Sequence, residues 1–276
     1  MSGRPLTRSG AALSRLGLGC GRIGSFNNMV PRAEQEACIR TAAELGVNLF
    51  DTADVYGQGD SERTLGRLLG RQRDDIFLVT KLGKKFSAKM RLLRPFKPIL
   101  KPLLARAGKG ETITAQRGDN IAHDFSPARY AAALDASLAR LRFDQVDALL
   151  LHSPPAAAIR APGVAEALAA LVASGKARYF GISCDDGDAL DAALDLPGLA
   201  MLELPIDLIA ARAADARLAA ARAAGVVILA REVIRLQPAL APLDAVRLAG
   251  ERDDVDTIVI GASRPERLRG LIEAAG

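Results

Sequence analysis

The sequence predicts an α/β protein built as a (β/α)₈ TIM barrel, in which eight parallel strands alternate with eight helices. Short runs rich in Leu and β-branched residues alternate with amphipathic stretches rich in Ala, Arg and Glu along the 276 residues. The apolar runs are continuous rather than broken at every second position, as expected of parallel strands buried on both faces. Strands are predicted at residues 15–19, 48–51, 76–81, 146–152, 178–183, 200–204, 226–230 and 257–261. Helices are predicted at residues 32–45, 61–69, 127–141, 164–174, 189–194, 215–224, 240–249 and 265–274.

A doubly wound sheet is the main alternative fold, because such sheets also alternate strands with helices. Gly17, Gly19 and Gly21 stand at the end of the first predicted strand, but no G-x-G-x-x-G pattern opens a helix there. Eight strand and helix pairs also exceed the roughly five to seven strands that are usual for a doubly wound sheet. The sequence therefore predicts one barrel domain over residues 1–276.

Two segments depart from the alternation of strands and helices. The N-terminus predicts a β-hairpin, with one strand at residues 4–7, a turn at residues 9–10 and a second strand from Leu13. After the strand that ends at Lys81, residues 84–125 predict a long loop without strands, rich in Pro and basic residues. The loop leaves the barrel face that carries active sites, so we expect a partly ordered flap over the substrate mouth. A plain surface excursion and an amphipathic membrane-binding or partner-binding element are the alternatives.

The composition excludes several classes of protein. The net charge of +5 is small for this length, and no basic stripe is interleaved with aromatic residues, so we expect no nucleic acid partner. No apolar run approaches the roughly 18 residues of a membrane-spanning helix, and the N-terminus lacks the pattern of a secretory signal. The three cysteines, Cys20, Cys38 and Cys184, are far apart, and no Cys/His cluster has zinc spacing. These features predict a cytoplasmic protein without disulfides or a metal site.

Four ionisable side chains stand at or just after the carboxyl ends of predicted strands. Asp51 ends the second strand, and Tyr56 follows it in the next loop. Lys81 ends the third strand, and His152 ends the fourth. Each residue alone also fits an ordinary role, such as a turn, a solvated strand end or a core histidine. Because active sites of these barrels lie at this face, the convergence of the four predicts a proton-transfer site.

The chemistry of the four groups is complementary. A phenol with its ordinary pKa near 10 is a poor proton donor at neutral pH. A buried ammonium at Lys81 is expected to lower the pKa of Tyr56, and Asp51 is expected to pair with Lys81. His152 is expected to orient a carbonyl oxygen or to share the proton. Tyr56 would then protonate an alkoxide or, in reverse, deprotonate an alcohol.

Five motifs, in order along the chain, resemble the signatures of bacterial-type members of the aldo-keto reductase superfamily. The most specific is Asp51-Thr-Ala-Asp-Val-Tyr56-Gly followed by Ser61-Glu62, which is similar to the family pattern D-T-A-x-x-Y-G…S-E. The resemblance covers the chain from about residue 4 to its end. The other motifs are Leu16-Gly-Leu-Gly19-Cys-Gly21, Thr80-Lys81, Leu149-Leu-Leu-His152-Ser-Pro154 and Arg178-Tyr-Phe-Gly181-Ile-Ser183.

This resemblance implies Tyr56 as general acid and base, Lys81 and Asp51 as its tuning pair, and His152 as the carbonyl-orienting group. It also implies a nicotinamide cofactor. Ser263 and Glu266 form a capping-box pattern whose free N–H groups suit a phosphate. The neighbouring side chains of Arg264 and Arg267 suit a 2′-phosphate, which favours NADP(H) over the alternative NAD(H). The implied cofactor-binding residues are Gly19, Cys20, Gly21, Ser183, Cys184, Glu203, Arg231, Gly261, Ser263, Arg264 and Arg267.

The chain also departs from the family pattern at positions implied to hold the cofactor. Cys184 and Glu203 stand where the family commonly has Asn and Gln for the nicotinamide amide. Arg231 replaces an aromatic stacking residue, and Leu271 replaces an Asn of the last helix. A guanidinium stacks on ring faces and a carboxylate accepts from an amide, so these departures bear on the cofactor pose. They leave the four catalytic positions unchanged.

We therefore expect an NADP(H)-dependent oxidoreductase, a monomer or weak homo-oligomer, that acts on a small carbonyl or hydroxyl compound. The long segment after Lys81 is similar to one in the family's sugar and aldose dehydrogenases, which adds sugars to the candidate substrates. Two alternatives belong to other classes: a catalytically weak NADP(H)-binding barrel that acts as a sensor or interaction partner, and a Schiff-base lyase that uses Lys81.

Overall fold

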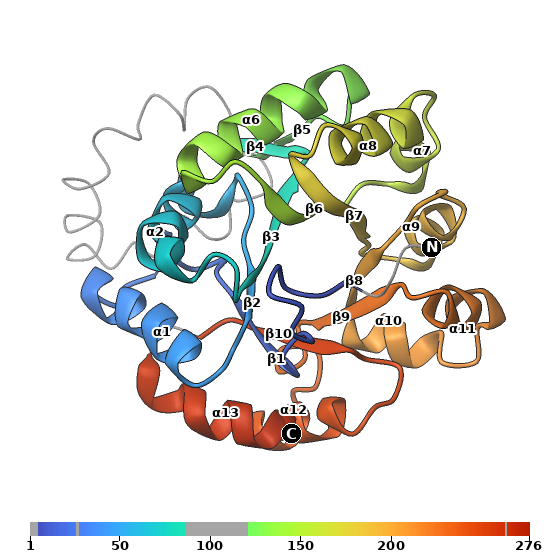
Figure 1. Cartoon of the computed structure of the whole chain (residues 1–276). Helices are drawn as coiled ribbons and strands as arrows, with labels where there is room; N and C mark the ends of the chain where they lie inside the picture. Colours follow the sequence, from blue (N-terminus) through green and yellow to red (C-terminus); the bar gives the residue numbers. More distant parts are fainter. Residues whose placement is uncertain (1–4, 26–27, 87–120, 263) are drawn as a thin grey trace.

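Eight parallel strands close into a barrel in a computed structural model that describes residues 5–25, 28–86, 121–262 and 264–276 (Figure 1). The order around the barrel is β1-β10-β9-β8-β7-β6-β3-β2. Each predicted strand is confirmed, and its ends agree with the prediction to within one residue. The barrel strands are β1 Leu16–Gly19, β2 Leu49–Asp51, β3 Phe77–Leu82, β6 Val146–His152, β7 Ala177–Ser183, β8 Met201–Pro205, β9 Val227–Arg231 and β10 Thr257–Ile260.

Helices form a ring outside the barrel, as Figure 1 shows in a view along the barrel axis. The eight predicted helices are present, and those predicted from residues 127 and 265 begin with 3₁₀ turns. The short α7 and α10 are additional to the prediction, because one or two turns give too few residues for a helical period. The helices are α1 Arg32–Glu44, α2 Asp60–Leu69, α6 Tyr130–Leu141, α7 Ala156–Ile159, α8 Val164–Ala173, α9 Gly187–Leu194, α10 Ile206–Ala211, α11 Ala216–Ala223, α12 Pro242–Gly250 and α13 Leu268–Ala275. The 3₁₀ turns are η1 Tyr56–Gln58, η2 Gly70–Gln72, η5 Pro127–Arg129 and η6 Pro265–Arg267.

The strands bury both faces, which explains their continuous apolar sequences. Outward-facing residues pack against the helices, and inward-facing residues fill the lower part of the barrel interior. Gly181 on β7 is needed where strands approach closely, because a Cβ there would lie 2.2 Å from the carbonyl oxygen of Met201. The interior cluster contains Leu49, Phe77, Val79, Ala148, Leu150, Met201, Val227, Leu229 and Val259. The polar groups of the site lie above this layer, at the carboxyl ends of the strands.

A buried ionic cluster links the strands at the N-terminal end of the barrel, opposite the end where the polar groups of the site lie. Asp147 near the start of β6 is fully buried between two guanidinium groups. Arg73 Nη1 lies 2.7 Å from Asp147 Oδ2, and Arg178 Nη1 lies 2.9 Å from Asp147 Oδ1. Asp147 also accepts the backbone N–H of Leu78 on β3. The Arg178 of the fifth strand motif is therefore structural, and it lies at the end of the strand remote from the site.

The predicted N-terminal hairpin is present only as its turn in the described residues from Pro5 onward. The N–H of Thr7 donates to the carbonyl oxygen of Ala11, but residues 5–15 form no paired strands. The segment is held by other parts of the barrel floor instead. Arg178 donates to the carbonyl oxygen of Leu6, and Ser14 N–H donates to the side chain of Asn48. These contacts satisfy backbone groups that a hairpin ladder would otherwise pair.

The long loop after the third barrel strand is structured at both described ends, which corrects the prediction of a segment without strands. β4 (Lys84–Phe86) pairs antiparallel with β5 (Ile121–His123), so that Lys84 lies opposite His123. Residues 87–120, the main part of the predicted flap, lie outside the described residues. No helix in the described part of the chain is long and apolar enough to cross a membrane.

Candidate active site

The four ionisable side chains singled out in the sequence meet at the mouth of the barrel. Lys81 on β3 is fully buried, and its ammonium contacts a carboxylate oxygen of Asp51 at the end of β2. Lys81 Nζ lies 5.3 Å from the centroid of the Tyr56 ring, which begins η1. The ring of His152, at the end of β6, packs edge-on against Tyr56 with centroids 5.5 Å apart. An acid, a base and a phenol thus lie within one buried cluster.

A fifth ionisable side chain, Glu203 on β8, shares Lys81 with Asp51. Glu203 Oε2 lies 3.0 Å from Lys81 Nζ, as an ion pair without the geometry of a hydrogen bond. Glu203 Oε1 lies 3.7 Å from Nε of Arg231 at the end of β9. Two carboxylates and two cations therefore form a cluster without net formal charge. Sequence reasoning assigns Glu203 to the cofactor and misses this pairing, because a strand position does not fix the direction of a long side chain.

The charges of the cluster determine the protonation of Lys81. Burial alone would lower the pKa of Lys81, but Asp51 and Glu203 raise it above its ordinary value, so the amine stays an ammonium. Burial raises the pKa of Asp51; Lys81 opposes this rise, and Glu203 adds to it. A Schiff-base lysine must lose its proton before it attacks a carbonyl. The raised pKa of Lys81 therefore argues against the lyase alternative.

Burial raises the pKa of Tyr56 above its ordinary value, which corrects the expectation that Lys81 lowers it. Lys81 does act in the expected direction, but burial and the carboxylates of Asp51 and Glu203 outweigh it. The ammonium is already balanced by two acids, so little net positive field remains at the phenol. Tyr56 is therefore a neutral phenol, the form that donates a proton.

His152 is a neutral imidazole in this environment. Burial lowers its pKa well below the ordinary value, and the cations Lys81, Lys84 and Arg231 lower it further. Its Nδ1 is buried and has no hydrogen-bond partner among the described residues. A neutral ring beside Tyr56 suits hydrogen bonding to a carbonyl or hydroxyl oxygen, rather than donation of a full positive charge.

The Ser61-Glu62 pair that follows the tyrosine motif fastens α2 to the barrel. Ser61 Oγ donates to the carbonyl oxygen of Cys20 at 3.0 Å and lies 2.8 Å from Thr52 Oγ1. Glu62 is fully buried, accepts from Thr80 Oγ1 at 2.8 Å, and pairs with Arg140 on α6. This part of the motif therefore positions the loop that carries Tyr56, and it does not reach the reacting groups.

A cavity of about 630 Å³ opens above the buried cluster. Glycines keep part of its wall open: a Cβ on Gly21 would stand 3.4 Å from the Tyr56 ring. The absence of a side chain at Gly21 leaves that space beside the phenol free, which is compatible with a flat ring bound there. The cavity is lined by Gly19, Gly21, Arg22, Asp51, Tyr56, Lys84, His152, Ser153, Ser183, Asp185, Glu203, Arg231, Glu232, Val233, Ile234, Arg235, Val259, Ile260 and Gly261.

The predicted cofactor-binding residues fall into two groups. Gly19, Gly21, Ser183, Glu203, Arg231 and Gly261 line the cavity. Cys20 and Cys184 are buried, and they are not among the residues that line the cavity. The backbone N–H of Cys20 donates to the carbonyl oxygen of Asp51, and the backbone N–H of Cys184 donates to the carbonyl oxygen of Glu203. Leu271 is buried in α13.

Two of the residues predicted to bind a cofactor phosphate, Arg264 and Arg267, are not among the residues that line the cavity. Arg264 and Arg267 are exposed on either side of Pro265, where η6 leads into α13. Ser263 of the predicted capping box lies outside the described residues. Among the lining residues of the cavity, Arg22 and Arg235 are additional cations that sequence reasoning does not single out, because each stands in an irregular loop without a motif.

Arg231 is held rigidly over the cavity. Its guanidinium contacts the carboxylate of Asp185 and donates to the carbonyl oxygen of Cys184 at 2.9 Å. Ser153 Oγ donates to the same Asp185 carboxylate at 3.0 Å. Arg231 therefore joins the loops that follow β6, β7 and β9, and it presents a fixed planar cation at the place of the family's aromatic ring.

The fold and this cluster define a parallel barrel with buried, interacting ionisable side chains at its carboxyl-terminal mouth. The chain belongs to the Aldo/keto reductase family, whose sequence model matches residues 15–238. The resemblance seen in the motifs is thereby confirmed.

Similar proteins include curated enzymes of several kinds. The uncharacterized oxidoreductase YcsN of Bacillus subtilis is 33% identical over 173 residues, which cover 62% of this chain and 49% of that protein. Pyridoxal 4-dehydrogenase of Microbacterium luteolum is 27% identical over 70% of this chain and 58% of its own length. D-threo-aldose 1-dehydrogenase of a Pseudomonas species is 32% identical over 53% of this chain and 42% of its own length. The matches thus span about half the length of these relatives.

Solved structures agree over almost the whole chain. A candidate aldo-keto reductase from Pseudomonas aeruginosa superposes with a TM-score of 0.74 at 25% identity, over 99% of this chain and 93% of that one. The holo form of aldo-keto reductase AKR11C1 from Bacillus halodurans has a TM-score of 0.73 at 22% identity, over 99% and 89% of the two chains. The second likeness shows the fold alone.

Proposed function

We propose that this protein is an NADP(H)-dependent oxidoreductase that interconverts a small aldehyde or ketone with its alcohol. The observation that carries the proposal is the buried cluster of Asp51, Tyr56, Lys81 and His152 beneath a cavity of about 630 Å³. The cluster offers a proton donor, a neutral imidazole and a fixed ammonium at one point, which is what carbonyl reduction requires.

Each residue has a defined part in the proposed reaction. The nicotinamide cofactor supplies the hydride in reduction and accepts it in oxidation. Tyr56, as a neutral phenol, donates its proton to the carbonyl oxygen as negative charge develops there. His152 hydrogen-bonds the same oxygen and orients it, and the Lys81 ammonium stabilises the tyrosinate that is left. Asp51 holds Lys81 in place and balances its charge.

Residues on two sides of the cavity would hold the cofactor. Gly19, Gly21 and Gly261 leave room for the nicotinamide end, and Ser183 and Glu203 offer hydrogen-bonding groups to its amide. Arg264 and Arg267 at the start of the last helix would bind a 2′-phosphate, which favours NADP(H) over NAD(H).

The substrate is proposed to be a small carbonyl or hydroxyl compound, with sugars among the candidates. The cavity lining supports a polar substrate, because charged side chains such as Lys84, Asp185 and Arg235 face it. Three buried free thiols support a cytoplasmic location, where thiols stay reduced. We propose one barrel domain that acts as a monomer or weak homo-oligomer.

The test is NADPH consumption with a reactive aldehyde by the wild type, by Tyr56→Phe and by Tyr179→Phe. Tyr179 is the matched control, because it stacks on Phe77 at the barrel wall and is not part of the cluster. We expect turnover in the wild type and in the control, and a loss of at least about a hundredfold in Tyr56→Phe, the usual contribution of one acid–base group. Equal turnover in all three proteins would contradict the role of Tyr56.

A catalytically weak NADP(H)-binding barrel is the second candidate, and one specific observation favours it. Glu203 and Arg231 are engaged with each other and with Lys81 and Asp185, so they have less freedom to adjust to a nicotinamide. Tight NADPH binding in a fluorescence titration, without turnover of aldehydes or oxidation of sugars, would support the sensor or interaction role.

A further inference from the structure

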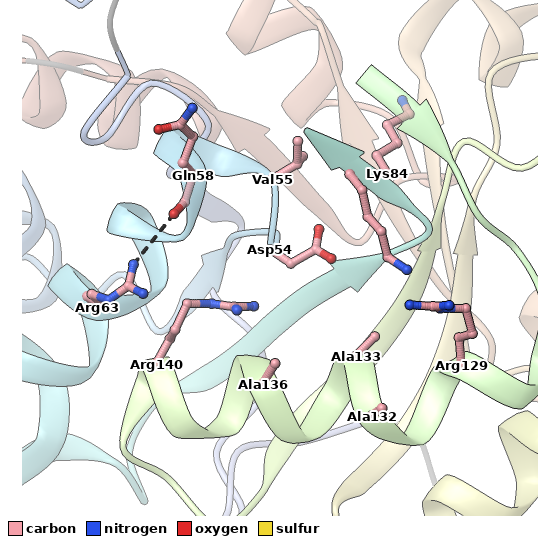
Figure 2. A pocket seen from close by; sticks show the side chains of 11 residues that line it. Asp54, Val55, Gln58, Arg63, Lys84, Arg129, Ala132, Ala133, Ala136 and Arg140 are labelled. Atoms are coloured by element: carbon pink, nitrogen blue, oxygen red, sulfur yellow. Dashed lines mark hydrogen bonds between the residues drawn. The ribbon is translucent and has the colours of Figure 1, made fainter. Parts of the chain in front are cut away.

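A second polar cavity of about 410 Å³ lies outside the barrel mouth, between η1, β4 and α6 (Figure 2). Its floor is one face of α6, where Ala132, Ala133 and Ala136 leave room above the helix. Figure 2 shows Arg129 and Arg140 at the two ends of this face, with their guanidinium groups directed toward each other. Lys84 is the only lining residue that this cavity shares with the cavity at the barrel mouth.

Cations dominate the lining of this outer cavity. Among the described residues five basic side chains line it, and Asp54 is the one carboxyl group in that lining. At one end Lys85 and Arg129 share one carboxylate, Asp124, at 2.8 and 3.0 Å, so within the described part of the chain two basic groups there have one acidic partner between them. The basic residues are Arg63, Lys84, Lys85, Arg129 and Arg140.

Two of the other basic groups, Arg63 and Arg140, have acidic partners that hold them in place. Arg140 pairs with the buried Glu62, and Arg63 lies 3.5 Å from Asp60. These pairs fix the direction of the guanidinium groups. Positioned guanidinium groups are the preferred partners of phosphate and carboxylate groups.

Asp54, in the wall of the cavity, carries a buried oxygen that requires a donor. Its Oδ1 is buried and has no hydrogen-bond partner among the described residues. Burial raises the pKa of Asp54 to about 7, and Glu62 adds to this rise while Arg140 and Lys85 oppose it. A buried carboxyl oxygen without a donor is costly, so a ligand in this cavity gains by offering an O–H group to Asp54.

We propose that the cavity is a binding site for a small hydroxylated oxyanion, whose anionic oxygens meet Arg129, Lys85 and Arg140 and whose hydroxyl group donates to Asp54. The five basic groups of the lining disfavour a metal ion or an organic cation as the ligand. An anion without a hydroxyl group would meet the cations but would leave the Asp54 oxygen unpaired and repelled. Phosphate groups and hydroxycarboxylates share the required chemistry, and inorganic phosphate is the simplest probe of it.

The test compares inorganic phosphate with sulfate by titration calorimetry at pH 8 and constant ionic strength. At that pH Asp54 is mainly ionised, phosphate carries an O–H group, and sulfate carries none. We expect phosphate to bind at least about tenfold more tightly than sulfate, the effect of one hydrogen bond to a charged group. Asp54→Asn should abolish this preference, because its amide also donates to sulfate. Arg129→Gln should weaken both anions about tenfold.

Two matched variants locate the bound phosphate. Arg247→Gln removes an exposed cation from α12, on the far side of the barrel in Figure 1, and should leave phosphate binding unchanged. Arg264→Gln removes a cation from the segment proposed to bind the cofactor phosphate. It should remove any phosphate bound at that segment and leave the binding that depends on Arg129 and Asp54. Phosphate binding that is lost in Arg264→Gln but not in Arg129→Gln would overturn the proposal, and so would equal affinity for phosphate and sulfate. Neither result depends on whether the protein turns over NADPH.

Discussion

Glu203 is the residue through which the acid–base site is most readily perturbed, because it sits between Lys81 and Arg231. Replacement of Glu203 by Gln keeps the size of the side chain and removes one negative charge from the buried cluster. The cluster of two acids and two bases then carries a net positive charge. A carboxylate near a phenol opposes ionisation, so its removal should lower the pKa of Tyr56.

The size of this effect follows from two distances. Lys81 Nζ lies 3.0 Å from Glu203 and 5.3 Å from the centroid of the Tyr56 ring, so no more than about 8 Å separates the carboxylate from the ring. At an effective dielectric constant of about 20, two unit charges at this distance interact by about 2 kcal/mol. This energy corresponds to a fall of about 1.5 units in the pKa of Tyr56.

The composition of the chain makes this shift visible. The protein has no tryptophan and three tyrosines, so the phenolate absorption of one residue is a large part of the whole signal. A spectroscopic pH titration of Glu203→Gln, minus that of the Glu203→Gln/Tyr56→Phe double variant, isolates Tyr56. The same subtraction gives the wild-type curve, and the Tyr56 phenolate should appear about 1.5 pH units earlier in the variant.

Glu232→Gln is the matched control for this experiment. Glu232 lies 3.1 Å from Arg231 Nη1, but it is not among the groups that shift the pKa of Tyr56. Its replacement should leave the Tyr56 titration in place. An unchanged or raised pKa in Glu203→Gln, or equal shifts in both variants, would refute the electrostatic role assigned to Glu203.

Three further predictions concern packing, ionisation and thiol burial. Gly66→Ala should lower the free energy of unfolding, measured in a urea titration, by about 1–3 kcal/mol, because the added Cβ would lie 1.8 Å from the carbonyl oxygen of Leu141. Gly70→Ala is the control and should be tolerated, because a Cβ added at Gly70 would have no other heavy atom within 4 Å among the described residues. The pKa of Asp54 is about 7 in the folded protein, above its ordinary value of 3.8. Between these two pH values the folded protein keeps a proton on Asp54 that the unfolded chain has lost. The free energy of unfolding therefore falls as the pH rises from about 4 to about 7. The melting temperature of Asp54→Asn minus that of the wild type should therefore be larger at pH 8 than at pH 5. The same difference at both pH values would contradict the ionisation of Asp54 in this range. Burial raises the pKa of Cys38 to about 11, and all three thiols are buried, so a thiol reagent should label the native protein slowly and the denatured protein at once.

Much of the fold could be predicted because its signals are local. Strands buried on both faces have to be continuous and apolar, and several of them end at or next to a polar residue where the chain leaves the barrel. Asp51, Lys81 and His152 could be placed at one rim for this reason, since parallel strands end on the same side. Short helices such as α7 and α10 give no such signal, because they are shorter than one full helical repeat of apolar positions.

The interactions of the site were harder to predict than its residues. The positions of Glu203 and Arg231 in the chain were predictable, but the pairing of Glu203 with Lys81 and with Arg231 depends on side-chain directions and on the closure of the barrel. The direction of the Tyr56 pKa shift depends on how two acids offset one ammonium, which only the assembled cluster shows. The outer cavity beside Asp54 is lined by residues that lie far apart in the chain, so no sequence motif predicts it.

The ionic cluster of Asp147 with Arg73 and Arg178 has a consequence for protein engineering. It ties strands together at the barrel floor, on the face opposite the loops that would contact substrate. Changes to those upper loops therefore leave these closing interactions intact. The chain is for this reason a promising scaffold for loop grafting. The segments after β7 and β9 could be exchanged to select new substrates, while the ionic cluster at the opposite end of the barrel stays unchanged.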